Sequence, residues 1–158
     1  MGVWYGMHRA DQNLFFQYND CDELTFTEKP NAYMEMQIDG FVTDTQTVDT
    51  GISGPFDMQC SNFIDGKCQF KNNALLPWSN WFVLDTDYET YTVVYGCNMD
   101  IAAMTKFNFV YSLTRVPLAI ATSAHDAIKD ITWPTFNSVP GVDADLLYSV
   151  AQTSDLGC

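Results

Sequence analysis

Basic residues are scarce in this sequence. Lys and Arg together number 7 against 20 Asp and Glu, so the 158-residue chain has a formal net charge of −13 at pH 7. Phosphate-rich surfaces repel a chain this acidic, which makes nucleic acid and anionic membranes poor partners. No apolar run approaches the roughly 18 residues of a membrane-spanning helix, and no basic and apolar leader precedes Gly2. We therefore expect no membrane span, and a mature or trimmed form of the chain.

Histidine is scarce as well, since only His8 and His125 occur, and the five cysteines form no CxxC pair. A zinc site needs several such ligands at short spacings, so we predict no metal centre. Neither histidine has an acidic or cysteine partner evident in the sequence, and Ser112 lies in no Gly-x-Ser-x-Gly motif, which argues against a serine hydrolase. The cysteines fit disulfides in an oxidising compartment. One thiol is left over, and spacing alone does not choose among fifteen connectivities.

Strand-forming residues are abundant. The chain is 47% hydrophobic and carries 11 Phe, 8 Tyr and 4 Trp, which suffices for the core of a single domain over residues 1–158. Segments rich in Tyr, Phe, Val and Thr are separated at short intervals by Gly, Asn, Asp and Pro, as is typical of an all-β fold. The predicted strands are residues 2–9, 22–28, 33–39, 45–52, 67–71, 79–86, 90–98 and 106–115. Eight antiparallel strands can close into an up-and-down barrel with room for one small ligand.

One helix is predicted after the last of these strands. Ser123 and Asp126 resemble a capping box, and an apolar face follows at helical spacing. That face consists of Ala124, Ala127, Ile128 and Ile131. Pro134 is expected to end the helix, and His125 is expected in its exposed first turn. The stretch from Val142 to Gln152 alternates again, which predicts a short final strand.

Three short motifs are spaced so that they can meet at one end of such a barrel. They are Gly2-Val3-Trp4-Tyr5, Asp85-Thr86-Asp87-Tyr88-Glu89-Thr90-Tyr91 and Phe109-Val110-Tyr111-Ser112-Leu113-Thr114-Arg115. With these motifs in this order, nearly the whole chain resembles the lipocalins, of the apolipoprotein D, retinol-binding and bilin- or carotenoid-binding type. The resemblance implies an eight-stranded antiparallel barrel with one C-terminal helix and a short final strand.

The resemblance also implies structural roles for the motif residues. In the family the tryptophan after Gly2 closes the barrel floor and the arginine after the eighth strand packs across it, so Trp4 and Arg115 are expected to stack. Thr86-Asp87-Tyr88 matches the turn that joins two strands at the closed end, where a carboxylate can accept backbone N–H bonds. Asp85 and Asp87 share a strand face, which invites an acid–base interpretation, but the turn explains them better.

Two disulfides are predicted on different grounds. Lipocalins commonly link the start of the second strand to the C-terminus, which maps onto Cys21 and Cys158 and would stabilise the fold by about 4 to 5 kcal/mol in the chain-entropy model. Cys60 and Cys68 flank a segment with an Asp-Gly turn, which predicts a local bridge. In related lipocalins the cysteine after the second motif often pairs with one upstream of the first. We therefore expect Cys97 to be free, or separated from a lost partner.

The family pattern also fixes which strand faces point into the barrel. The side chains expected to contact a ligand are mostly apolar or aromatic: Leu14, Phe16, Leu24, Phe26, Met34, Met36, Trp81, Val83, Thr92, Val94, Phe109 and Tyr111. Leu14 and Phe16 match positions that cover the cavity mouth in retinoid-binding relatives. No basic residue falls on these predicted faces, so a ligand carboxylate would lack a partner. The alternative is that the side chains simply fill the interior and leave no cavity.

The function implied by these observations is a secreted lipocalin that carries or stores a small hydrophobic molecule, with no catalytic cofactor. The strand faces predicted to point into the barrel favour a neutral elongated ligand such as a carotenoid or retinoid, and the ligand could be a chromophore. Bilin, fatty-acid or sterol binding are alternatives, as is an enzyme of the same fold, of the isomerase type. The sequence leaves the oligomeric state open, whether homo- or hetero-oligomer.

Overall fold

The computed structural model describes residues 1–11, 19–30, 33–42, 47–62, 65–71, 78–100, 105–142, 148–150 and 152. Within these ranges lie nine strands and one helix. The strands are β1 (Gly2–Asp11), β2 (Asn19–Lys29), β3 (Tyr33–Val42), β4 (Thr47–Asn62), β5 (Lys67–Lys71), β6 (Ser79–Thr86), β7 (Tyr91–Asp100), β8 (Thr105–Thr114) and β9 (Tyr148–Ser149). The helix is α1 (Ser123–Ser138). None of the described helical residues form a segment long and apolar enough to cross a membrane.

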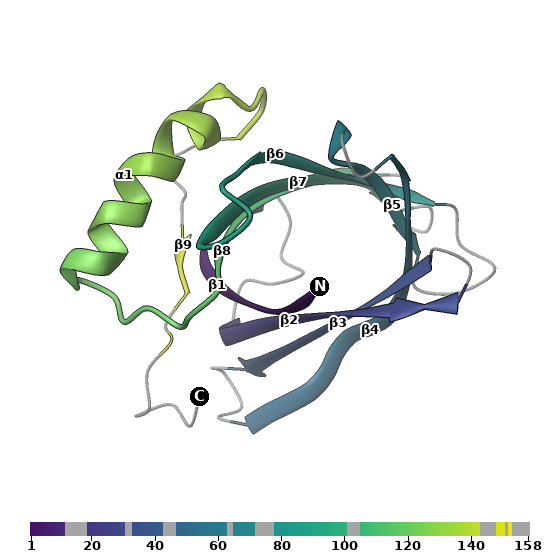
Figure 1. The fold of residues 1–158 in the computed structure, drawn as a ribbon, viewed down its shortest axis with the longest axis horizontal. Coiled ribbons are helices and arrows are strands. Elements are labelled where there is room, and N and C mark those ends of the chain that lie inside the picture. The colour runs from purple at the N-terminus through teal and green to yellow at the C-terminus, as the bar shows by residue number, and fades with distance from the viewer. Residues whose placement is uncertain are drawn as a thin grey trace.

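Strands β1 to β8 form a closed antiparallel barrel in which each strand pairs with its neighbours in the chain. The barrel closes because β1 pairs with both β8 and β2. Figure 1 shows the resulting ring of strands. The predicted eight-stranded up-and-down barrel is therefore confirmed. The expected strands 67–71 and 79–86 coincide with β5 and β6, whereas β4 continues ten residues beyond the predicted end at residue 52.

Alternation along the strands separates an inner from an outer face. Directly paired residues share a face, so Trp4 opposite Leu24, and Val94 opposite Tyr111, bring apolar side chains from neighbouring strands together inside the barrel. From Gly6 onward β1 no longer pairs with β2. The edge of β1 that had paired with β2 pairs instead with the short β9. The β1–β2 pairing is thus short, and the barrel is irregular at this seam.

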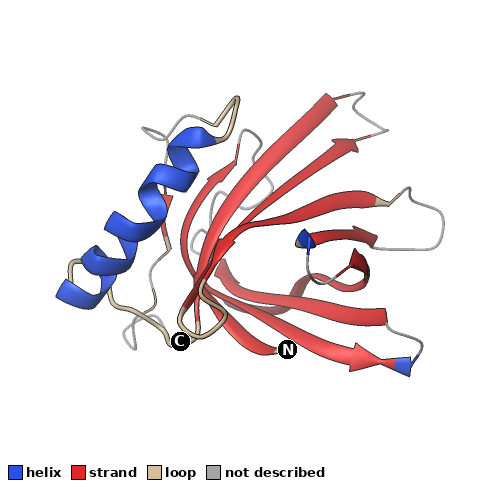
Figure 2. Ribbon diagram, turned by 45° about the horizontal axis from the view of Figure 1, so that its top comes forward, coloured by secondary structure: helices blue, strands red, loops and turns tan. Residues whose placement is uncertain are grey.

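Helix α1 lies outside the barrel, beside β9 and against the outer faces of β6 and β7 (Figures 1 and 2). Thr122 is its N-cap, because its side-chain oxygen accepts a hydrogen bond from the His125 backbone N–H at 3.3 Å. Phe136 and Val139 pack on Val93 and Val110 of the barrel wall. This second, smaller apolar cluster helps to hold the helix to the barrel.

Three expectations about the helix were wrong. The cap is Thr122, one residue before the expected Ser123. Pro134 lies inside the helix and does not end it, because burial of Phe136 beyond the proline outweighs one missing backbone hydrogen bond. The expected apolar face is also turned away from the barrel: Ile131 is 49% exposed, whereas the buried face of the helix carries His125, Thr132 and Phe136.

Candidate ligand site inside the barrel

The three sequence motifs meet at one end of the barrel. The guanidinium of Arg115 lies over the ring of Trp4, 3.7 Å from its centroid. Arg115 also donates hydrogen bonds to the backbone oxygens of Met1 (2.9 Å) and Val3 (3.3 Å). The predicted stacking of Trp4 and Arg115 is confirmed. Gly2 has a φ of +97°, in the region that favours glycine, and it lies beside this guanidinium.

The turn between β6 and β7 is organised by the Asp87 carboxylate. One of its oxygens accepts backbone N–H bonds from Glu89 (3.0 Å), Thr90 (2.8 Å) and Tyr91 (3.0 Å), and the other accepts the Thr90 hydroxyl. These bonds, above all those from Thr90, hold the pKa of Asp87 well below its usual range. The carboxylate therefore tightens the turn as expected.

The other members of the second motif also make structural contacts. The Thr86 hydroxyl donates to the Tyr91 carbonyl at 2.8 Å and accepts the Tyr88 N–H at 2.9 Å. Asp85 instead accepts a hydrogen bond from the Thr135 hydroxyl of α1 at 3.3 Å. The Asp85 carboxylate also bonds the Tyr91 side chain, so the two carboxylates are engaged by different donor groups, which gives an acid–base pair no support.

The barrel interior holds one continuous apolar cluster drawn from all eight strands. Nine of the residues predicted to contact a ligand belong to it or pack against it: Leu24, Phe26, Met34, Met36, Trp81, Val83, Val94, Phe109 and Tyr111. Thr92 is buried beside them, opposite Leu113. Leu14 and Phe16 lie outside the described residues. The structure brings the described members of the set together, and their contact with a ligand stays a prediction.

Aromatic rings dominate the centre of this cluster. Phe70 contacts Trp81 and Phe109, with ring centroids 5.8 and 6.3 Å apart, and Trp81 contacts Phe109 at 5.6 Å. Gly96 makes room for them, since a Cβ at this position would lie 2.0 Å from the tip of the Phe109 ring. The close packing of Phe109 therefore requires glycine on the neighbouring strand.

One polar cluster lies on the same inner wall. Arg9 Nη1 donates to Asp22 Oδ2 at 3.0 Å, and the Tyr111 hydroxyl donates to the same oxygen at 3.4 Å. Both ionic side chains are buried, with 2% and 0% of their surface exposed. Burial raises the pKa of Asp22 to about 7, and the Arg9 guanidinium offsets only part of this rise.

The expectation that no basic residue faces inward was therefore wrong. Strict alternation from Trp4 would place Arg9 on the outer face, but a register shift between Gly6 and His8 moves it to the inner face opposite Tyr111. Asp22 was also missed, although a signal for it existed. It lies two residues before Leu24, in the same strand phase as the predicted inner residues of β2.

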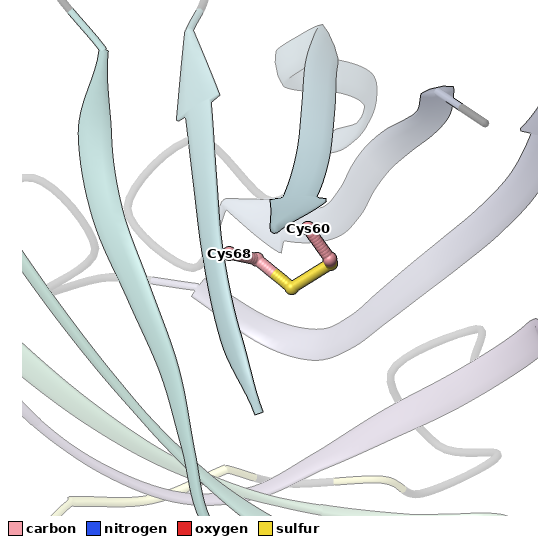
Figure 3. The surroundings of a disulfide bond; sticks show 2 residues. All are labelled: Cys60 and Cys68. Carbon is pink, nitrogen blue, oxygen red and sulfur yellow. A yellow bond between two sulfur atoms is a disulfide. The ribbon is translucent and has the colours of Figure 1, made fainter. Parts of the chain in front are cut away.

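Cysteine chemistry follows the prediction where it is described. Cys60 and Cys68 form a disulfide between paired positions of β4 and β5, as Figure 3 shows. Cys21 is also disulfide-bonded, and its predicted partner Cys158 lies outside the described residues, so that pairing stays a prediction. Cys97 is a free thiol, and its sulfur accepts a hydrogen bond from Asn80 Nδ2 at 3.8 Å.

The wall around this disulfide also carries a depression of about 490 Å³. It shares no residue with the predicted ligand-contact set and is lined by Gln59, Cys60, Lys67, Cys68, Gln69, Asn80 and Phe82.

No family model and no curated protein matches this sequence. Solved structures do match. Lobster apocrustacyanin A1 aligns with a TM-score of 0.69 at 16% identity, over 98% of this chain and 78% of that one. Insecticyanin from the tobacco hornworm Manduca sexta aligns with a TM-score of 0.69 at 14% identity, over 98% and 79% of the two chains. The cockroach allergen Per a 4 aligns at 0.67 and 16%, over 100% and 88%.

The chain has the lipocalin fold. A siderocalin, Ex-FABP, which functions through dual ligand specificities, matches as well, with a TM-score of 0.64 at 11% identity over 96% of this chain and 89% of that one. At these identities the similarity is one of fold alone. Any inference about a ligand therefore depends on the residues of this barrel itself.

Outside the barrel wall lies a buried pair of histidines that the sequence did not reveal. The rings of His8 on β1 and His125 on α1 lie 4.7 Å apart, and both side chains are buried, so the expected exposure of His125 was wrong. His8 Nδ1 lies 3.4 Å from Ser112 Oγ. Burial lowers the pKa of His8 to about 4, and the neighbouring charges of His125 and Lys129 add to this effect. The pair joins the helix to the barrel and lies apart from the interior.

Proposed function

We propose that this protein is a secreted binding protein that carries or stores a small, neutral, elongated hydrophobic molecule inside its barrel, such as a carotenoid or retinoid. The observation that carries the proposal is the interior cluster. It combines the aromatic rings of Phe70, Trp81 and Phe109 with flexible methionines such as Met36 and Met58. Aromatic and methionine side chains form adaptable apolar walls of the kind that enclose small ligands.

The charge inside the barrel supports a neutral ligand. Arg9 is the basic side chain of the inner wall among the described residues, and its guanidinium is ion-paired with Asp22. A ligand carboxylate would have to compete with Asp22 for that guanidinium and would also meet the field of a chain with net charge −13. Burial of about 400 Å² of ligand surface would contribute roughly 10 kcal/mol before the costs of association, so apolar contact suffices for useful affinity.

Secretion and a non-enzymatic role belong to the same proposal. The Cys60–Cys68 disulfide favours an oxidising compartment. An isomerase of this fold that used a thiol would need that thiol in the interior, whereas Cys97 is absent from the interior cluster. The chemistry of the described residues thus favours binding over turnover.

The test begins with the protein purified without denaturation. An absorption spectrum, solvent extraction and mass spectrometry would identify a copurifying molecule, and we expect a visible or near-ultraviolet band that disappears on unfolding. Retinol and a carotenoid would then be titrated against tryptophan fluorescence. Quenching should weaken in Trp81→Phe, in the interior cluster, and persist in Trp133→Phe, on the helix. A protein that copurifies with nothing and takes up neither molecule would contradict the proposal.

A further inference from the structure

Arg9, Asp22 and Tyr111 form a buried, hydrogen-bonded polar cluster on a mostly apolar inner wall. Both the guanidinium and the phenol donate to Asp22 Oδ2. The other carboxylate oxygen, Oδ1, is buried and has no hydrogen-bond partner among the described residues. A buried acceptor without a donor destabilises the folded protein, and more so when it is charged. Within the described part of the chain, the Asp22 carboxylate therefore lacks a donor at Oδ1.

The backbone fixes the position of this carboxylate. Asp22 stands against Gly6, where an added Cβ would lie 2.8 Å from the Asp22 Cβ. Gln152 Nε2 donates to the carbonyls of both Gly6 and Asp22, at 3.1 Å each, across the seam where β1 and β2 stop pairing. The backbone that carries the carboxylate is thus tied to Gly6 of the neighbouring strand.

The polar cluster adjoins the aromatic one. The Tyr111 ring contacts the Phe109 ring at a centroid distance of 6.0 Å, and Phe109 in turn contacts Trp81. A molecule whose apolar body lies along Phe109 and Trp81 therefore has one end at Asp22. The proximity of an apolar wall to a single fixed acceptor is the arrangement that orients a ligand with one polar end.

We propose that Asp22 Oδ1 accepts a hydrogen bond from a hydroxyl group at the end of the ligand, so that the barrel selects an elongated apolar alcohol. This assignment rests on the proposed function and narrows it. A hydroxyl supplies the missing donor without adding charge to a pair that is already neutral. A terminal carboxylate would place a second anion beside Asp22 and near Asp20, and a terminal ether or hydrocarbon would leave Oδ1 without a donor.

The raised pKa of Asp22 agrees with this reading. Its cause is burial that the Arg9 guanidinium and the Tyr111 hydroxyl offset only in part. A further donor at Oδ1 would stabilise the charged form, so binding of an alcohol should lower the pKa of Asp22.

The experiment compares three probes with one hydrocarbon skeleton: retinol, retinyl methyl ether and retinoic acid. Each would be titrated into the intact protein, with tryptophan fluorescence as the readout. We expect retinol to bind at least about tenfold more tightly than the ether, which corresponds to about 1.4 kcal/mol and matches one hydrogen bond to a charged acceptor. Retinoic acid should bind more weakly than retinol.

A double variant, Arg9→Met with Asp22→Val, keeps Tyr111 and removes the buried ion pair of this cluster, so that neither charge is left unpaired. In this variant, retinol and the ether should bind equally, with ether affinity close to that of the wild type. The matched control places the same residue types at an exposed ion pair, as Lys29→Met with Glu35→Val, and should keep the preference for retinol.

The outcomes separate the two proposals. If the wild type binds retinol and the ether equally, or binds retinoic acid most tightly, the hydroxyl assignment is wrong and hydrophobic ligand binding stands. If none of the three probes binds and no molecule copurifies, both proposals fail. Should the double variant not fold, the comparison of alcohol and ether in the wild type decides alone.

Discussion

Arg115 is a residue whose role in the structure is to hold the closed end of the barrel together. Its guanidinium stacks on Trp4 and donates to two backbone oxygens of the first residues. Loss of the cation–ring contact costs about 0.5 to 2 kcal/mol, and loss of the hydrogen bonds adds about 1 kcal/mol. We expect Arg115→Ala to lower the free energy of unfolding by about 1 to 3 kcal/mol, measured by urea denaturation, while retinol affinity changes little.

The control for this prediction is Arg115→Lys. Lysine keeps the charge but loses the planar fork, so its stability should lie between wild type and Arg115→Ala. A large loss of ligand affinity with unchanged stability would show that the stacked pair lines the ligand site.

Gly96 permits the packing of Phe109, so its substitution tests the interior directly. In Gly96→Ala the new Cβ would overlap the Phe109 ring, which is itself enclosed by Phe70, Trp81 and Tyr111. We expect a loss of about 1 to 3 kcal/mol in the free energy of unfolding from overpacking.

The fluorescence of Trp81 should also shift in Gly96→Ala, because the Phe109 ring must move against it. The double variant Gly96→Ala with Phe109→Leu should recover part of the stability, and this coupling is what a double-mutant cycle measures. Additive losses would contradict direct contact.

At the residue scale, the inward direction of a side chain was predicted correctly where a strand alternates regularly, and wrongly where the backbone is irregular. Leu24, Phe26 and Met36 lie on regular stretches of β2 and β3, and their inward phase could be predicted. Arg9 follows a bulge that no residue of β1 indicates. The face of the strand on which Arg9 lies could therefore not be predicted. For this local reason the buried pair of Arg9 and Asp22 was not predicted.

At the scale of elements, the strands were easier to predict than the helix. Turn residues and β-branched or aromatic runs located all eight barrel strands, because both signals are local. The buried face of α1 is set by what it docks against. His125 is buried because His8 lies beneath it, and the sequence separation of the two hides that contact.

The docking of α1 should weaken in acid. The folded state lowers the pKa of His8 to about 4, whereas an unfolded chain protonates histidine near about 6.5. Between these values the unfolded state binds the extra proton, so the free energy of unfolding falls as the pH falls, by up to about 3 kcal/mol from this group. Urea denaturation between about pH 7 and 4, with Trp133 of α1 as the fluorescent reporter, measures the slope.

The variant His8→Phe keeps a flat ring but cannot titrate. His8 Nε2 has no hydrogen-bond partner among the described residues, so ring carbon can replace it at little cost. Asp22 acts in the opposite direction over the same range, since its raised pKa favours the folded state in acid. The difference between wild type and His8→Phe isolates the histidine, and parallel pH profiles would show that His8 contributes nothing to it.

At the scale of the whole molecule, barrel closure followed from the number of strands and from three motifs that meet at one end. The antiparallel order needs only neighbouring strands to pair, which the short connections favour. The point at which β1 and β2 stop pairing could not be predicted, because it depends on where β9 replaces β2 as the neighbour of β1. Asp22 is buried beside this point, packed closely against Gly6.

The charge of the whole molecule makes a further prediction about salt. A net charge of −13 places many carboxylates within one small fold, and their mutual repulsion destabilises the compact state. The Debye length falls from about 30 Å at 0.01 M salt to about 8 Å at 0.15 M, which is shorter than the width of a domain of this size. We expect NaCl over this range at pH 7 to raise the melting temperature by a few degrees.

Screening by ionic strength predicts the same rise with KCl and no comparable rise with sucrose at low concentration, as calorimetry or thermal denaturation would show. Since the repulsion comes from carboxylates, the salt effect should shrink at about pH 4, where many of them are protonated. A melting temperature that is flat or falls with salt would mean that attractive ion pairs outweigh the repulsion. The ion pairs on the described outer surface, such as Lys29 with Glu35 and Asp57, are too few for that outcome.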